Sequence, residues 1–238
     1  MLATAFATRD DNSGLDHADY GHIATSHDKG LLTDRLFGGP VRTIEAKEHA
    51  FLEGDTVTHV FKVEVGHICV YRTVLDGRRQ IVDFAYPGDL IGLGSVGEYS
   101  HSAQATTRTR LRPIPVGALH KAVERDGRLG IKLYEALARE LNASREMLFT
   151  VTQRTAGERV AAFLLALSRR NARNGADPNE FVLPMTRTDI ADFLGLTIET
   201  VSRMFTKLRV EGVIDLEQCV LVKIVNHEAL AARAESRH

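Results

Sequence analysis

The chain has 238 residues, of which 44% are hydrophobic and 26% are charged; this composition excludes a wholly disordered, collagen-like or disulfide-scaffold protein. Its 30 Lys and Arg residues nearly balance its 31 Asp and Glu residues, giving a formal net charge of −1. That balance excludes a uniformly basic protein that binds nucleic acid everywhere, but it allows one locally basic face.

No targeting or membrane segment is predicted. Residues 1–10 contain neither a basic nor an apolar region of the secretory kind, and no apolar run approaches the ~18 residues that a membrane span requires. The two cysteines, Cys69 and Cys219, lie too far apart for a C-x-x-C motif. We therefore expect a cytoplasmic protein with reduced thiols and no membrane partner.

The first half of the chain predicts a flexible tail followed by a β domain. Residues 1–25 are polar and aperiodic, which is typical of a loose N-terminal tail. Residues 26–126 are assigned to a β domain, because short Val-, Ile-, Phe- and Tyr-rich runs alternate there with regularly spaced Gly, Pro and Asp. This pattern indicates an antiparallel barrel or sandwich. Asp76-Gly77 predicts its clearest hairpin turn.

A long helix is predicted over residues 127–153. Apolar positions recur there at alternating spacings of 3 and 4, a seam that either packs on the β domain or pairs with a second copy of the chain. The narrow stripe favours a homodimer. Ser144 interrupts the seam, and the predicted dimerisation residues are Tyr134, Leu137, Leu141, Leu148 and Val151.

Residues 154–238 are predicted to form a helical domain with a β-hairpin. Residues 154–157 are a candidate hinge, residues 158–170 a helix and residues 171–179 a loop. Two apolar runs about a polar centre between residues 213 and 225 predict a hairpin wing.

A helix-turn-helix is indicated within this domain. Thr186 is positioned to cap a first helix with Asp189 three residues later, as in a capping box. Gly195 provides a tight turn, Thr197 caps a second helix, and Gly212 ends it. Two short helices around a glycine-containing turn are typical of this motif.

The second helix has one apolar and one polar face. We expect the apolar face to pack inward through Ile198, Val201, Phe205 and Leu208. Glu199, Ser202 and Arg203 are neighbours on the other face, near the helix N-terminus. Arg can donate two hydrogen bonds to guanine, Glu can accept from cytosine N4, and Ser can bond several base edges. These three residues are therefore the predicted base contacts in a DNA major groove.

Local charge agrees with binding to double-stranded DNA. Residues 154–209 carry nine Lys or Arg and six Asp or Glu. Phosphate contacts would supply affinity that depends on salt but not on sequence. Arg154 and Arg209 are available for it, and the predicted phosphate-contacting residues are Thr186, Arg187, Thr197, Thr200 and Lys207.

The chain resembles the CRP/FNR superfamily of bacterial transcription regulators over nearly everything after residue 30. The resemblance is carried by Phe51-Leu52-Glu53-Gly54-Asp55, Asp76-Gly77-Arg78-Arg79-Gln80, Pro87-Gly88-Asp89-Leu90-Ile91-Gly92, Arg159-Val160-Ala161-Ala162-Phe163-Leu164 and Leu194-Gly195-Leu196-Thr197-Ile198-Glu199-Thr200-Val201-Ser202-Arg203. The last motif is similar to that of the FNR/FixK branch, whose recognition helices carry E-x-x-S-R.

The resemblance implies an α+β chain: an N-terminal antiparallel β-roll (a cyclic-nucleotide-binding-like jelly roll), a long dimerisation helix and a C-terminal winged helix-turn-helix. It also implies a homodimer on a TTGA-N6-TCAA-like palindrome and a surface for RNA polymerase. Arg203 would read the G·C pair, Glu199 the partner cytosine and Ser202 a thymine.

Two departures from the family predict a regulator without cofactors. Where cyclic-nucleotide binders carry a Glu and an Arg-Ser pair, this chain has Leu93 and His101-Ser102, so we expect no tight binding of cAMP. Residues 1–40 contain no cysteine, and two thiols are too few for a [4Fe–4S] cluster. The resemblance is then to FixK, whose group controls low-oxygen metabolism such as nitrogen fixation, respiration or denitrification.

Two alternatives keep the DNA-binding role. In the first, a small effector or haem in the β-roll gates DNA binding, with His49, His59, His67, His101 and His120 as candidate ligands. In the second, oxidation of Cys219 in the wing adds negative charge that repels DNA. An enzyme is not expected, because the sequence has no nucleophile elbow, P-loop or H-E-x-x-H motif.

Overall fold

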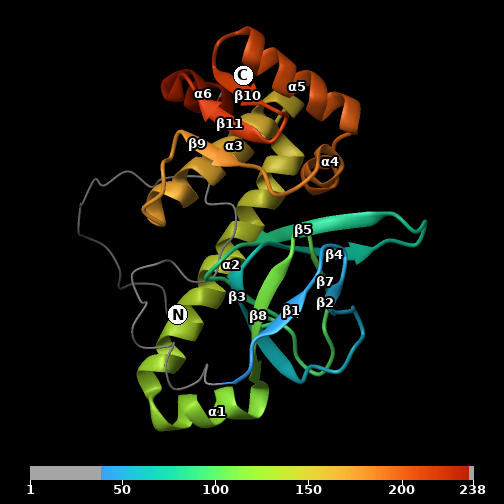
Figure 1. Cartoon of the computed structure of the whole chain (residues 1–238), viewed down its shortest axis with the longest axis vertical. Helices are drawn as coiled ribbons and strands as arrows, with labels where there is room; N and C mark the ends of the chain where they lie inside the picture. Colours follow the sequence, from blue (N-terminus) through green and yellow to red (C-terminus); the bar gives the residue numbers. More distant parts are fainter. Residues whose placement is uncertain (1–38, 236–238) are drawn as a thin grey trace, which may run out of the picture.

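The computed structural model describes residues 39–235. A β-roll, a long helix and a helix-rich C-terminal domain follow one another along the chain (Figure 1). The predicted fold class, α+β with a β-roll and a helix-turn-helix, is confirmed. The predicted tail at residues 1–25 and the first part of the predicted β domain, residues 26–38, lie outside the described residues.

The β-roll consists of two antiparallel four-stranded sheets with the orders β1-β8-β3-β6 and β2-β7-β4-β5. Its apolar core lies between the two sheets. The turn predicted at Asp76-Gly77 joins β4 to β5, and Gly77 adopts the positive φ of 82° that such a turn requires. The strands are β1 (Arg42–Ile44), β2 (His49–Phe51), β3 (His59–Val65), β4 (Ile68–Thr73), β5 (Arg79–Ala85), β6 (Leu90–Ile91), β7 (Ser102–Ala105) and β8 (Thr109–Pro115).

Two helices follow the β-roll. The first, α1 (Val116–Arg125), has no counterpart in the sequence prediction. The second, α2 (Gly127–Gln153), covers the range that the apolar seam predicts, and the Asp126 side chain caps it by accepting a hydrogen bond from the backbone N–H of Arg128. It buries one face through residues spaced seven apart: Leu129, Ala136, Ala143 and Thr150.

The C-terminal domain contains four helices and a three-stranded sheet of order β10-β11-β9. The helix predicted to end at residue 170 continues to residue 173. The sequence predicts neither β9 nor α6, whereas the predicted wing hairpin is confirmed as β10 and β11. The elements are α3 (Ala156–Arg173), β9 (Glu180–Val182), α4 (Arg187–Leu194), α5 (Ile198–Val210), β10 (Ile214–Glu217), β11 (Leu221–Ile224) and α6 (His227–Ala234).

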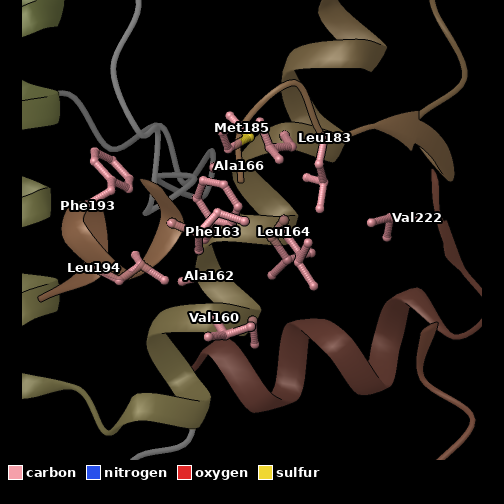
Figure 2. Packing of buried hydrophobic residues seen from close by; sticks show 14 of the residues in the cluster. Val160, Ala162, Phe163, Leu164, Ala166, Leu183, Met185, Phe193, Leu194 and Val222 are labelled. Carbon is pink, nitrogen blue, oxygen red and sulfur yellow. The ribbon is translucent and has the colours of Figure 1, made fainter. Parts of the chain in front are cut away.

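Helix α3 is the centre of this domain's core. Figure 2 shows its side chains Val160, Phe163 and Leu164 among residues from the helix-turn-helix and the sheet, including Leu194 and Val222. The same apolar cluster includes buried residues of β4 and β5, so the two domains pack directly against each other, while the β-roll keeps its own core between the sheets. That packing fixes where the helix-turn-helix sits. No helix in residues 39–235 is long and apolar enough to cross a membrane.

Candidate nucleic-acid interface

Local hydrogen bonds define both helices of the helix-turn-helix. The backbone N–H of Asp189 donates to Thr186 Oγ1 at 3.1 Å, and the N–H of Thr186 donates to Asp189 Oδ2 at 2.9 Å, so the predicted capping box begins α4. Gly195 ends α4 in the left-handed region with φ of 63°. Thr197 then caps α5 by accepting from the N–H of Thr200 at 3.3 Å.

Three of the four residues predicted to pack inward from α5 do so. Val201, Phe205 and Leu208 are at most 4% exposed. The prediction is wrong for Ile198, which is 42% exposed. Ile198 is the first helical residue, and α5 becomes buried only from Val201 onward.

The three predicted base-contacting residues lie together on the exposed face of α5. Glu199, Ser202 and Arg203 are all exposed within the first two turns. Its own backbone N–H, the nearby Thr197 hydroxyl and the positive charge of Arg203 lower the pKa of Glu199. This face therefore carries an ionised acceptor and a guanidinium donor, which are the kinds of group that can bond base edges in a major groove.

The predicted phosphate contacts differ in their surroundings. Thr186, Thr197 and Lys207 are exposed and Thr200 is half-buried. The Arg187 guanidinium lies 3.7 Å from the Phe205 ring centroid, and burial lowers its pKa. Arg187 thus packs α4 against α5, a role that sequence reasoning missed.

Arg154 and Arg209, the two other arginines available for phosphate binding, differ in exposure. Arg209 is exposed on α5. Arg154 is half-buried at the end of α2, and within the described part of the chain its Nη1 is buried without a hydrogen-bond partner. Arg154 is therefore a poor candidate for an open phosphate contact.

The two cysteines lie in contrasting environments. Cys219 is exposed in the turn between β10 and β11, with φ of 62°. Cys69 is buried in β4, and burial raises its pKa to about 12, which suppresses the reactive thiolate. Cys219 is the more accessible of the two to oxidants.

Helix α2 carries an exposed apolar stripe along the predicted seam. Tyr134 is 72% exposed and Leu148 is 63% exposed, Leu137 and Leu141 are exposed as well, and Val151 is half-buried. A stripe of large apolar side chains in water is unusual for a monomer and marks an interaction surface.

A cavity of about 520 Å³ lies between α2 and the β-roll. Leu93 and His101, the departures from the cyclic-nucleotide pattern, both line it. Glu140 of α2 also lines it; burial raises the pKa of its carboxyl group, and Oε2 has no hydrogen-bond partner among residues 39–235.

The candidate histidine ligands are dispersed. His49 Nε2 hydrogen-bonds the Tyr71 hydroxyl at 2.9 Å, and His101 Nδ1 hydrogen-bonds the Ser100 hydroxyl at 2.9 Å. Within the described ranges, no three His, Cys, Asp or Glu side chains form a group able to hold a metal ion.

Two family models match most of the chain. Residues 41–126 match a cyclic nucleotide-binding domain, and residues 158–233 match a Crp-like helix-turn-helix domain. These matches coincide with the β-roll and with the domain that carries α4 and α5.

Similar proteins are named as transcription or nitrogen-fixation regulators. The chain is 40% identical over 167 residues to the nitrogen fixation regulation protein FixK of Bradyrhizobium diazoefficiens, covering 70% of each chain. It is 34% identical over 178 residues to the transcriptional activator protein FnrA of Stutzerimonas stutzeri, covering 74% of this chain and 73% of that one. The solved structure of FixK2 from Bradyrhizobium japonicum superposes with a TM-score of 0.78 at 32% identity, covering 84% of this chain and 98% of FixK2.

Proposed function

The chain belongs to the FixK-like subgroup of the CRP/FNR family, and we propose that it binds a TTGA-N6-TCAA-like palindrome as a homodimer. Members of this family are transcription regulators, not enzymes, and they bind DNA as dimers. In this proposal it acts mainly as an activator, in the cytoplasm, and controls low-oxygen metabolism such as nitrogen fixation, respiration or denitrification. RNA polymerase is its proposed protein partner.

The grouping of Glu199, Ser202 and Arg203 on the exposed start of α5 carries this proposal. A recognition helix contacts base edges with its N-terminal residues when it lies in the major groove. Arg203 donates two hydrogen bonds to guanine O6 and N7, Glu199 accepts from cytosine N4, and Ser202 contacts a thymine. The exposed Thr186, Thr197 and Lys207 contact phosphates around this centre.

The exposed seam of α2 supports the homodimer. Pairing two copies through Tyr134, Leu137, Leu141, Leu148 and Val151 removes the apolar stripe from water and presents two copies of α5. Two recognition helices about one DNA turn apart match a palindrome.

A gel shift of protein purified without cofactors tests this function. The proposal predicts a dimer-sized complex on TTGAT-N4-ATCAA, unchanged by cAMP, and much weaker binding to a scrambled duplex. Equal binding to both duplexes at physiological salt contradicts sequence-specific recognition.

The cavity between α2 and the β-roll favours a second candidate, in which a small effector or haem gates the same DNA-binding role. A Soret band in the purified protein, or DNA affinity that changes when haem is added, supports gating. If both are absent, the cofactor-free regulator is supported.

The exposure of Cys219 favours a third candidate, an oxidation switch. A sulfenic or sulfinic acid in the wing would add bulk and negative charge near the phosphates. If Cys219→Ser and the wild type lose equal DNA affinity under peroxide, this switch does not exist.

A further inference from the structure

We infer that the hydroxyl of Thr200 positions Arg203 for its contact with a base, and that Thr200 acts through Arg203 instead of contacting a phosphate. This inference rests on the proposed base contact of Arg203. It replaces the sequence-based role of Thr200 with a different one.

Thr197, Thr200 and Arg203 form a continuous hydrogen-bonded chain along the first turns of α5. Arg203 Nη2 donates to Thr200 Oγ1 at 3.1 Å, and the Thr197 hydroxyl donates to the same oxygen at 3.1 Å. One end of the chain therefore holds the proposed donor for guanine.

The Thr200 oxygen is already engaged in the free protein. It accepts hydrogen bonds from both Thr197 and Arg203, and its residue is half-buried, whereas Thr197 and Arg203 are exposed. A hydroxyl oxygen has two lone pairs, so both of its acceptor sites are used, and only its O–H is left to donate to a phosphate. The half-buried position of Thr200 and its bond to Arg203 favour support of that side chain.

The hydrogen bond restricts Arg203 without blocking it. A guanidinium has five N–H donors, so one bond to Thr200 leaves enough for a two-bond contact with guanine. Arginine otherwise loses much rotamer freedom on binding, and a side chain held beforehand loses less. The expected benefit falls on recognition of the G·C pair, because Arg203 is the side chain that is restricted.

Two variants of Thr200 separate positioning from phosphate contact. Thr200→Val keeps the β-branched shape and removes the hydroxyl, whereas Thr200→Ser keeps the hydroxyl. For each, dissociation constants are measured by fluorescence anisotropy on TTGAT-N4-ATCAA and on the same duplex with the G·C pair replaced in both half-sites.

We expect Thr200→Val to lower the ratio between the two dissociation constants by about tenfold, from the loss of one hydrogen bond in each half-site. Thr200→Ser should keep the wild-type ratio. A direct role at the phosphates gives the opposite result: Thr200→Val weakens binding to both duplexes by the same factor and leaves the ratio unchanged, because a contact with a phosphate does not depend on the base sequence. That result overturns the inference.

Arg203→Ala in the same assay separates this inference from the proposed function. If Arg203→Ala leaves the ratio unchanged, the base contact itself is wrong, and the inference fails with it. If Arg203→Ala lowers the ratio but Thr200→Val does not, the function stands and only the positioning role fails. Thr200→Val added to Arg203→Ala should have no further effect on the ratio. Thermal melting of each variant verifies that α5 remains folded.

Discussion

Arg79 of the β-roll holds Asp189 of the helix-turn-helix through an ion pair that joins positions 110 residues apart. Arg79 Nη2 donates to Asp189 Oδ1 at 2.9 Å, while its Nη1 donates to Gln104 Oε1 at 2.9 Å. The other oxygen of Asp189 completes the capping box with Thr186. One carboxylate thus begins α4 and also ties α4 to the β4–β5 hairpin.

Other contacts join the same two parts of the molecule. Arg170 of α3 forms a buried ion pair with Asp89 at 2.7 Å, and its guanidinium lies 4.0 Å from the Tyr86 ring centroid. Phe84 of β5 packs against Phe193 of α4 with 5.3 Å between ring centroids. The DNA-binding domain is therefore docked on its own β-roll.

Arg79→Ala should lower the free energy of unfolding by about 1–2 kcal/mol, because it leaves the largely buried Asp189 without its cation. Urea unfolding measures this change. Arg78→Ala is the matched control: Arg78 pairs with Asp76 in the exposed turn, so we expect no measurable change. Equal losses in the two variants contradict a special role for the interdomain pair.

His67 should make stability depend on pH. Burial and the positive charge of Arg170 lower the pKa of His67 to about 4, below its ordinary value of 6.5. The folded state therefore favours neutral His67; its contribution to stability is complete above about pH 6.5 and is lost as the pH falls toward 4. Between about pH 7.5 and pH 5, the wild type should lose more stability than His67→Gln. Parallel unfolding curves for the two proteins contradict this assignment.

Leu141→Asp should convert the dimer to a monomer, because a charge on the seam of α2 has no partner in an apolar interface. The control is Asn142→Asp, an equally charged change at an exposed residue outside the seam. Sedimentation velocity distinguishes the species. If both variants remain dimeric, the seam is not the interface.

Cyclic AMP should bind weakly or not at all. Leu93 and His101 supply no carboxylate or guanidinium for a cyclic phosphate, and Glu140 turns a carboxylate toward the same cavity. Titration calorimetry should give no saturable heat at micromolar protein. A low-micromolar dissociation constant refutes this expectation.

Local signals in the sequence predicted much of the helix-turn-helix formed by α4 and α5. The capping residues Thr186 and Thr197 and the turn at Gly195 act within a few positions, so their geometry follows from residue type. The spacing between Thr200 and Arg203 is also a helical neighbour spacing, and it offered a signal for their hydrogen bond that the prediction did not use.

Long-range contacts were beyond sequence reasoning. The partner of Arg79 depends on how two domains dock, and no local pattern encodes it. The stacking of Arg187 on Phe205 likewise follows from the angle between α4 and α5. Ile198 was misassigned because helical periodicity gives the direction of a face but not where along the helix burial begins.

One measurement tests base recognition by α5 most directly. It compares the affinities of the wild type and of Arg203→Ala for the palindrome and for the duplex in which both G·C pairs are replaced. The wild type should prefer the palindrome strongly. Arg203→Ala should bind both duplexes alike, with a loss of about 1–3 kcal/mol per half-site on the palindrome alone. A variant that weakens both duplexes by the same factor contradicts a base contact and assigns Arg203 to the phosphates.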